Sequence, residues 1–196
     1  VRGGDTVTGL TGVLHWSFAG LTGTDAWRVR PVTGRSYTFT PANPRPTTPP
    51  SVGGTMKVAS FNVLNYFTTL EVPGALCGPS NLECRGANTA EELARQRAKI
   101  VSAMTSIDAD VLGLIEIQND SGASVADLVA ALNAATAPGT YAYVDTGTIG
   151  GDAIKTALVY RAAAVSPVGP FKVLDSTVDP RFVDTRNRPA LIQTFE

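Results

Sequence analysis

The sequence is short of histidine, with His15 the only one among 196 residues. Histidine is the commonest general acid or base in enzymes, so one histidine excludes much hydrolytic chemistry from this chain. Excess charge is also lacking, since 16 basic and 17 acidic residues give a net charge of -1. This balance excludes a strongly basic nucleic-acid-binding chain and an acidic tail. No apolar run approaches the roughly 18 residues that span a bilayer, so no membrane span is predicted.

Cysteine is scarce as well, with only Cys77 and Cys84, which enclose the loop GPSNLE. The loop holds no histidine and no second cysteine pair, which argues against zinc. We predict a local disulfide in a secreted or cell-surface protein, and the alternative is two unpaired thiols. Such a disulfide would fix the shape of the loop.

Two kinds of composition meet near residue 50. Residues 1–40 hold short β-rich runs broken by glycine and threonine, which predict strands of a small barrel or sandwich. Residues 41–55 carry five prolines, which predict an extended linker. Forty residues with few large apolar side chains make a poor independent core. We therefore expect residues 1–40 to be the last strands of a β domain that begins upstream.

From residue 56 to residue 196 the pattern alternates between strands and helices. Strands are expected at 56–62, 110–117, 141–144, 157–160 and 189–195. Thr89 and Glu92 form a capping box at the start of one helix, and Ser124 with Asp127 indicates an acidic variant of the same cap for a second. The second helix is expected to stop near residue 138. The order βαβαβββ predicts an α/β (α+β) layer with helices against one face of the sheet.

Glu116 is the first candidate for chemistry, because it follows apolar residues at the end of a strand that is expected to be buried. Open α/β sheets bind ligands at strand ends, and a carboxylate there is costly unless something pairs with it. The alternative is a glutamate that turns to solvent or meets an arginine. Asn62 ends the other central strand, and its amide oxygen is a donor that hard cations accept beside a carboxylate.

Basic and acidic residues also flank later strands. Arg188 precedes the final strand, and Asp152 and Lys155 flank the start of the strand before it. A cation at the mouth of a strand can hold phosphate oxygens, and the alternative is an exposed charge at the rim. The solvated face of the first helix is expected to carry Arg95, Arg97 and Lys99.

Several motifs occur together in one order. They are VASFNVLNYF at 58–67, CRGAN at 84–88, RQRAKIV at 95–101, ADVLGLIEIQN at 109–119, DPRF at 179–182 and NRP at 187–189. Together they resemble the endonuclease/exonuclease/phosphatase superfamily, and most closely its large secreted bacterial nuclease branch. The resemblance covers residues 56–196. The preceding residues are similar to the segment that closes an oligonucleotide-binding-like (OB-like) β domain in those proteins.

The resemblance implies a DNase I-like, four-layer αββα sandwich that cleaves phosphate esters with a divalent metal. By position, Glu116 would be a ligand of Mg²⁺ or Mn²⁺, with Ca²⁺ as a further option. Asn62 would support the metal or the scissile phosphate, and Asp152 would be a catalytic, orienting group. The implied substrate contacts are Lys155, Asn187 and Arg188.

The family also uses motifs that this sequence lacks, namely Asn-His, Gly-Asp-Phe-Asn and Ser-Asp-His-Asp-Pro. These carry its catalytic histidines, its water-activating aspartate and a further metal ligand. We therefore expect this chain to be the N-terminal half of the domain, inactive alone, with the missing half, in the same or another chain, covering the apolar inner face of the sheet. The implied function of the parent protein is an extracellular nuclease acting on DNA or RNA. The alternatives are another phosphoesterase, such as a nucleotidase or sphingomyelinase, and a non-catalytic scaffold or surface-layer component.

Overall fold

The computed structural model describes residues 2–18, 24–43, 46 and 48–196. The chain divides into two compact units, Val1–Thr48 and Pro49–Glu196. The division falls inside the proline-rich segment 41–55, where regular backbone hydrogen bonding is disfavoured. Each unit is described by itself below.

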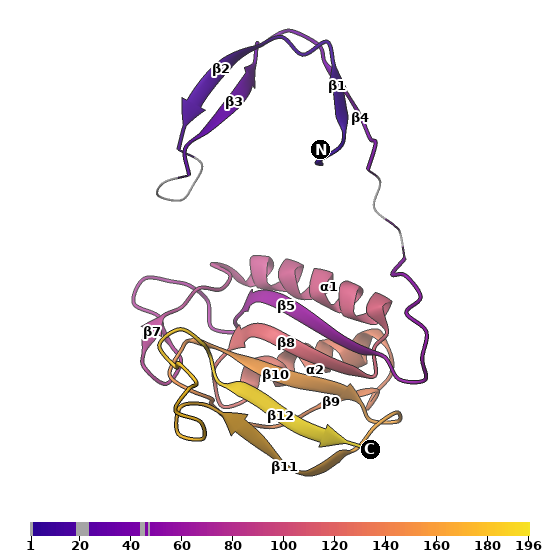
Figure 1. Cartoon of the computed structure of the whole chain (residues 1–196), viewed down its shortest axis with the longest axis vertical. Helices are drawn as coiled ribbons and strands as arrows, with labels where there is room; N and C mark the ends of the chain where they lie inside the picture. Colours follow the sequence, from indigo (N-terminus) through magenta and orange to yellow (C-terminus); the bar gives the residue numbers. More distant parts are fainter. Residues whose placement is uncertain (1, 19–23, 44–45, 47) are drawn as a thin grey trace. The chain divides into compact units, whose positions relative to one another are not determined.

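The first unit contains two separate two-stranded antiparallel sheets (Figure 1). They pair β1 (Thr6–Thr8) with β4 (Thr38–Thr40) and β2 (Gly12–Ser17) with β3 (Ala26–Pro31). Trp16 and Trp27 lie opposite each other with ring centroids 5.2 Å apart, and both remain more than half exposed. Within the described residues these strands close no barrel, so the OB-like assignment stays a prediction.

The second unit is built on a four-stranded mixed sheet. Its strand order is β5 (Val58–Tyr66), β8 (Val111–Gln118), β10 (Ile154–Arg161) and β9 (Tyr141–Tyr143). β5 and β8 run parallel, whereas β10 is antiparallel to both of its neighbours. The predicted mixed α/β class is confirmed, and the carboxyl ends of the two parallel strands share one edge of the sheet.

Two helices, α1 (Ala90–Ile107) and α2 (Ala123–Ala135), pack on one face of this sheet (Figure 1). The predicted capping box of α1 is present, because Thr89 Oγ1 accepts a hydrogen bond from the Glu92 amide at 3.2 Å and Glu92 Oε2 accepts one from the Asn88 amide at 2.9 Å. The core beneath the helices includes Ile100, Met104, Leu112, Leu114, Leu128, Leu132 and Val159. No helix in the described ranges is long and apolar enough to cross a membrane.

The predicted cap of α2 is wrong. Gly122 occupies the N-cap position without a side-chain hydrogen bond, and Ser124 is already inside the helix. Asp120 takes over the capping role, because its Oδ2 accepts hydrogen bonds from the amide of Ser124 at 3.0 Å and from its hydroxyl at 2.6 Å. Asp127 instead accepts a hydrogen bond from the buried hydroxyl of Tyr66 and so joins α2 to β5.

Three strands of the second unit were not predicted, and β11 (Pro167–Leu174) is the longest of them. β11 pairs antiparallel with β12 (Ala190–Phe195), and its two prolines and glycine hide the apolar alternation. Proline is tolerated there because a two-stranded ribbon has only edge strands. Two further short strands, β6 (Leu76–Cys77) and β7 (Leu82–Glu83), form a hairpin.

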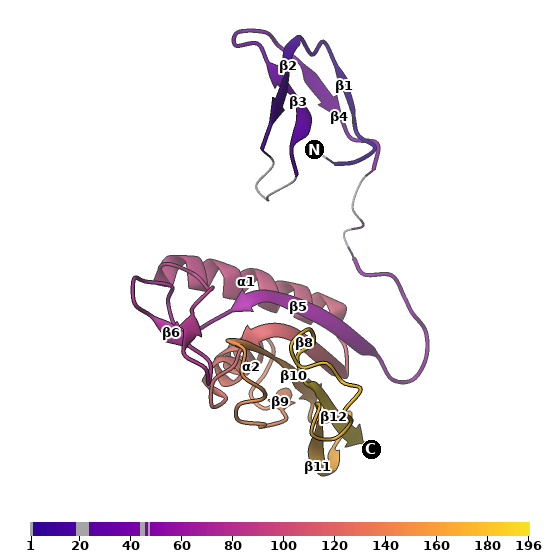
Figure 2. The same cartoon turned by 60° about the vertical axis from the view of Figure 1, so that its left-hand side comes forward.

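β12 lies on the side of the main sheet that the helices leave open (Figures 1 and 2). Val159 faces the helices in the core, so its neighbour Tyr160 points to the opposite face, where its ring packs 5.3 Å from that of Phe195. Over β5 and β8 the same face exposes 68% of Val58 and 37% of Ile115. The hairpin β11–β12 therefore covers only part of this face.

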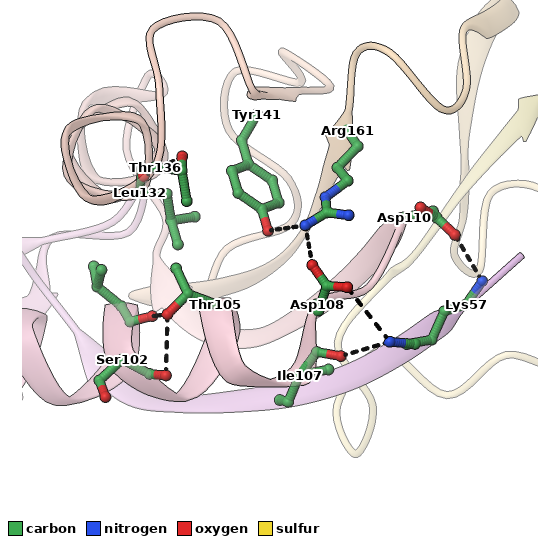
Figure 3. Close-up of polar contacts among 11 residues, drawn as sticks. Lys57, Ser102, Thr105, Ile107, Asp108, Asp110, Leu132, Thr136, Tyr141 and Arg161 are labelled. Carbon is green, nitrogen blue, oxygen red and sulfur yellow. Dashed lines mark hydrogen bonds and ion pairs between the residues drawn. The ribbon is translucent and has the colours of Figure 1, made fainter. Parts of the chain in front are cut away.

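A polar cluster fastens the start of β5 to the end of α1 (Figure 3). Asp108 ends the helix in the left-handed conformation and pairs with Lys57 at 3.7 Å and with Arg161. Lys57 Nζ donates to the Ile107 carbonyl at 3.2 Å, and its amide donates to Asp110 Oδ2 at 2.8 Å. The cluster lies where β5 and β8 begin, at the edge opposite their carboxyl ends. Its charged groups pair with one another and with backbone groups, and so stabilise the fold.

Candidate functional site

The carboxyl ends of β5 and β8 form an irregular edge of the sheet. Asn62 lies opposite Ile115, and the ladder then shifts register before Tyr66. Three described non-glycine residues at this edge have positive φ, namely Leu64 (54°), Asn65 (51°) and Glu116 (67°). Each such conformation costs about 1–3 kcal/mol, and such residues concentrate at binding and catalytic sites. Ligand sites of open α/β sheets also lie at this kind of edge.

A β-bulge re-aims the chain at Glu116. The register between β10 and β8 shifts between Lys155 and Ala157, so that Ile115 and Glu116 together oppose Thr156. Bulges often redirect side chains next to functional sites. The hydroxyl of Thr156 is buried and finds no hydrogen-bond partner among the described residues.

Glu116 itself is partly buried and makes no hydrogen bond or ion pair within the described part of the chain. The alternative in which it pairs with an arginine is therefore not observed there. Both of its carboxylate oxygens are therefore available to a cation. Partly removing a carboxylate from water without a partner is costly, so a bound cation would stabilise its charged form.

The side chain of Asn62 is exposed and held by its own backbone. Its Oδ1 accepts a hydrogen bond from the Leu64 amide at 2.7 Å, which closes a local turn at the strand end. Its Nδ2 has no acceptor in the described chain. Asn62 can therefore donate to a phosphate oxygen, while the second lone pair of Oδ1 can face a cation.

The few oxygen donors at this edge limit which metal ions could bind there. Zinc sites need three or four close His, Cys or carboxylate ligands, and the described residues contain no group of three that could hold a metal ion. With one carboxylate and one amide, a cation bound at this edge would have to keep most of its ligands as water or phosphate oxygens, as Mg²⁺ and Mn²⁺ commonly do.

Asp152 holds two arginines beside this edge. Its Oδ1 accepts from Arg85 Nη2 at 2.7 Å and its Oδ2 from Arg188 Nε at 2.8 Å. Burial would raise the pKa of Asp152, but the hydrogen bond and charge of Arg188, the Ala153 amide and the charge of Arg85 outweigh burial and lower it. With its oxygens used in this way, Asp152 orients the guanidinium groups.

A cavity of about 390 Å³ adjoins the Asp152–Arg188 pair. Asn187 also lines it, although its amide donates to the Val183 carbonyl at 3.2 Å. The predicted residues Asp152, Asn187 and Arg188 are therefore brought together. Arg85 was missed, because nothing in the sequence pairs it with a carboxylate so distant along the chain.

Lys155 is placed differently, since it is only 3% exposed. Its Nζ donates to the Asp120 carbonyl at 3.3 Å, to Thr146 Oγ1 at 3.4 Å and to the Gly147 carbonyl. Burial lowers the pKa of Lys155, and the charges of Asp120 and Asp145 only partly oppose this. The ammonium group is used to fasten the loop that leads to β10, so this placement does not support substrate contact.

The predicted disulfide joins Cys77 to Cys84, whose Cα atoms are 5.1 Å apart. The loop packs directly on the Asp152 segment, since a Cβ on Gly78 would lie 2.7 Å from the carbonyl oxygen of Asp152 and from Ala153 Cα. Cys84 immediately precedes Arg85, so the disulfide fixes the position from which the arginine reaches Asp152.

Comparison with known proteins adds no family assignment. The sequence matches no protein-family model and no curated protein. The chain and its candidate site thus define a mixed α/β protein with an unpaired carboxylate and a paired arginine cluster along one edge of a sheet.

Proposed function

We propose that residues 56–196 supply the metal-binding half of an endonuclease/exonuclease/phosphatase-type domain, and that the complete domain hydrolyses phosphodiester bonds as an extracellular nuclease. The observation that carries the proposal is Glu116, an unpaired carboxylate at a strained strand end next to Asn62. The order of the sequence motifs and the disulfide are consistent with this assignment.

The residues of the edge would act on the substrate in distinct ways. Glu116 and Asn62 would hold Mg²⁺ or Mn²⁺, and Asn62 Nδ2 would also contact the phosphate. A cation bound there supplies charge neutralisation for the phosphate oxygens and the leaving group. Arg188, oriented by Asp152, has further N–H donors for a non-bridging phosphate oxygen.

The proposed architecture is a sandwich of two sheets. Two features support it, namely the hairpin β11–β12 on the open side of the main sheet and the exposed Val58 and Ile115 beside it. The remaining strands of the second sheet would cover Val58 and Ile115. The histidines and aspartates that the family uses for water activation do not occur in this sequence, so we expect the 196 residues to bind metal without turnover.

Isothermal titration of the chain with Mn²⁺ tests the carboxylate. We expect Glu116→Gln to weaken Mn²⁺ binding at least tenfold, since the charged ligand is lost. Glu196→Gln is the matched control, because Glu196 is exposed and follows Phe195, which packs against Tyr160 opposite the start of β8, at the other edge of the sheet. Equal Mn²⁺ affinity of E116Q and the unsubstituted chain would contradict the proposed site.

Plasmid nicking tests the reaction itself. We expect the complete protein to nick supercoiled DNA with Mg²⁺ and not with EDTA, and the 196-residue chain to be inactive under both conditions. Robust cleavage by the chain alone would contradict the proposed division of the active site.

A further inference from the structure

We propose that a basic groove along α1 binds the phosphate backbone of a nucleic acid and leads it toward the strand end at Asn62. The basic groove is a depression of about 380 Å³ that is lined in part by Arg85, Arg95 and Lys99. The inference rests on the proposed function, which it deepens by assigning the surface that holds the substrate backbone away from the scissile bond.

The basic groove is continuous with the candidate site. A second depression of about 190 Å³ is lined by Asn62, Leu64, Gln96 and Lys99, among others. Leu64, Gln96 and Lys99 line both depressions, so one surface runs from Asn62 to Arg85. Figure 2 shows α1 running alongside β5, and residues of both elements line this surface together with the segment 85–87.

The charges in the groove are unbalanced. Its single carboxylate, Glu92, accepts a hydrogen bond from the Asn88 amide and forms a solvent-exposed ion pair with Arg95 at 3.9 Å. Lys99 has no carboxylate partner among the described residues, and Arg85 uses one nitrogen on Asp152. The groove thus has three cations and one carboxylate in its lining, and Asp152, which pairs with Arg85, is shared with Arg188, although residues 56–196 carry a net charge of -4. This local excess is complementary to a polyanion.

The spacing of the cations is fixed by the helix. Arg95 and Lys99 are four residues apart on one face of α1, about 6 Å along its axis. Between them Gln96 Nε2 donates to the carbonyls of Val63 at 3.2 Å and Leu64 at 2.8 Å, which ties α1 to the end of β5. Arg97 belongs to another face, since its Nε lies 3.4 Å from Asp127. The three basic residues expected on one solvated face are therefore divided between two surfaces.

A polymer explains this arrangement better than a small ester does. A single phosphate held at Glu116 and Asn62 leaves Arg85 and Arg95 without a role in binding. A nucleic acid carries a further phosphate at each nucleotide, so its backbone can occupy both places at once. Each neutralised phosphate of a duplex contributes about 0.9 to the slope of log K against log salt concentration.

Fluorescence anisotropy with a labelled duplex oligonucleotide tests the groove. Measurements of the 196-residue chain in EDTA across a series of NaCl concentrations exclude turnover and metal bridging. We expect Lys99→Ala to weaken binding about three- to tenfold and to reduce the salt slope by about 0.9, and Arg95→Ala/Lys99→Ala to reduce it by about 1.8. Lys172→Ala is the matched control, an exposed lysine on β11 outside the groove, and should match the unsubstituted chain.

Three outcomes would overturn the proposed role of the groove. They are an unchanged salt slope for K99A, equal losses of oligonucleotide affinity for K99A and K172A, and no oligonucleotide binding by the chain at low salt. Displacement of the oligonucleotide by poly-glutamate at equal charge concentration would assign the groove to acidic polypeptides instead. The Mn²⁺ titration of E116Q is independent of this assay. If E116Q bound Mn²⁺ as tightly as the unsubstituted chain while K99A showed the expected reduction in salt slope, the proposed metal site would be contradicted and the proposed nucleic-acid binding would stand.

Discussion

Arg85 and Asp152, which are 67 residues apart in sequence, are joined by a hydrogen bond of 2.7 Å. Because Asp152 also accepts from Arg188 at 2.8 Å, one carboxylate gathers three chain segments beside the sheet edge. The side chains of both arginines stay 40–45% exposed, so the ion pairs leave guanidinium surface open to solvent. Asp152 is therefore the residue on which the arrangement of this region depends.

The first prediction concerns Asp152→Asn. Both arginines and the Ala153 amide lower the pKa of Asp152 below 3.8, so the charged form stabilises the fold above that pH, and the contribution is lost as pH falls through the folded-state pKa. We expect D152N to reduce the free energy of unfolding by about 1–3 kcal/mol at pH 7. Urea unfolding at neutral and acidic pH should show the difference shrinking on acidification. A difference that is independent of pH would contradict this account.

The second prediction concerns the buried ammonium of Lys155. Burial lowers its pKa below 10.5, so the unfolded chain binds more protons than the folded one between the two pKa values. Stability of the unsubstituted chain should therefore rise, relative to Lys155→Met, as pH increases toward 10.5. Chemical denaturation across an alkaline series measures the difference. For Lys172→Met, at an exposed position, the difference in free energy of unfolding from the unsubstituted chain should not change with pH. For the unsubstituted chain, a free energy of unfolding that falls relative to that of K155M as pH increases toward 10.5 would refute the prediction.

The third prediction separates packing from backbone strain at Gly78. Gly78 and Gly74 both have positive φ, 72° and 84°, so alanine strains the backbone at either position. Only at Gly78 would the new Cβ meet other backbone, at 2.7 Å, whereas nothing lies within 4 Å at Gly74. We expect Gly78→Ala to cost about 1–3 kcal/mol more than Gly74→Ala, as overpacking does. Similar melting temperatures for the two variants would contradict this prediction, because they would show that the loop shifts to accommodate the new Cβ.

The fourth prediction concerns the disulfide, which spans a sequence separation of 7. Chain-entropy arguments give about 2–3 kcal/mol for closing so short a loop. We expect Cys77→Ala/Cys84→Ala to lower the melting temperature, and reduction of the unsubstituted chain to give a similar shift. Reductant should leave the double variant unchanged. A melting temperature unaffected by both treatments would mean that packing alone holds the loop.

Local signals predicted much of the second unit. The capping box of α1, the apolar run of β8 and the disulfide depend on residues that are close in sequence, so their patterns were readable. β11 was missed because its prolines and glycine read as a loop. The cap of α2 was misassigned because Asp120, an acceptor just before the helix, replaces the expected pair Ser124 and Asp127.

The site was predictable only in part, for a physical reason. Glu116 and Asn62 stand at recognisable strand ends, but the bulge at Glu116 opposite Thr156 arises from pairing between strands and has no local sequence pattern. Arg85 and the burial of Lys155 depend on contacts made across 67 and 35 residues. Such contacts exist only once the chain has folded.

The two hydrogen bonds from Gln96 to the carbonyls of Val63 and Leu64 join the helix to the end of β5. If the groove grips the backbone and the strand end carries the cation, the span between them is constant. The scissile bond would then lie a fixed number of nucleotides from the phosphates bound in the groove. Substrates shorter than this distance would bind more weakly, because they could not reach the groove.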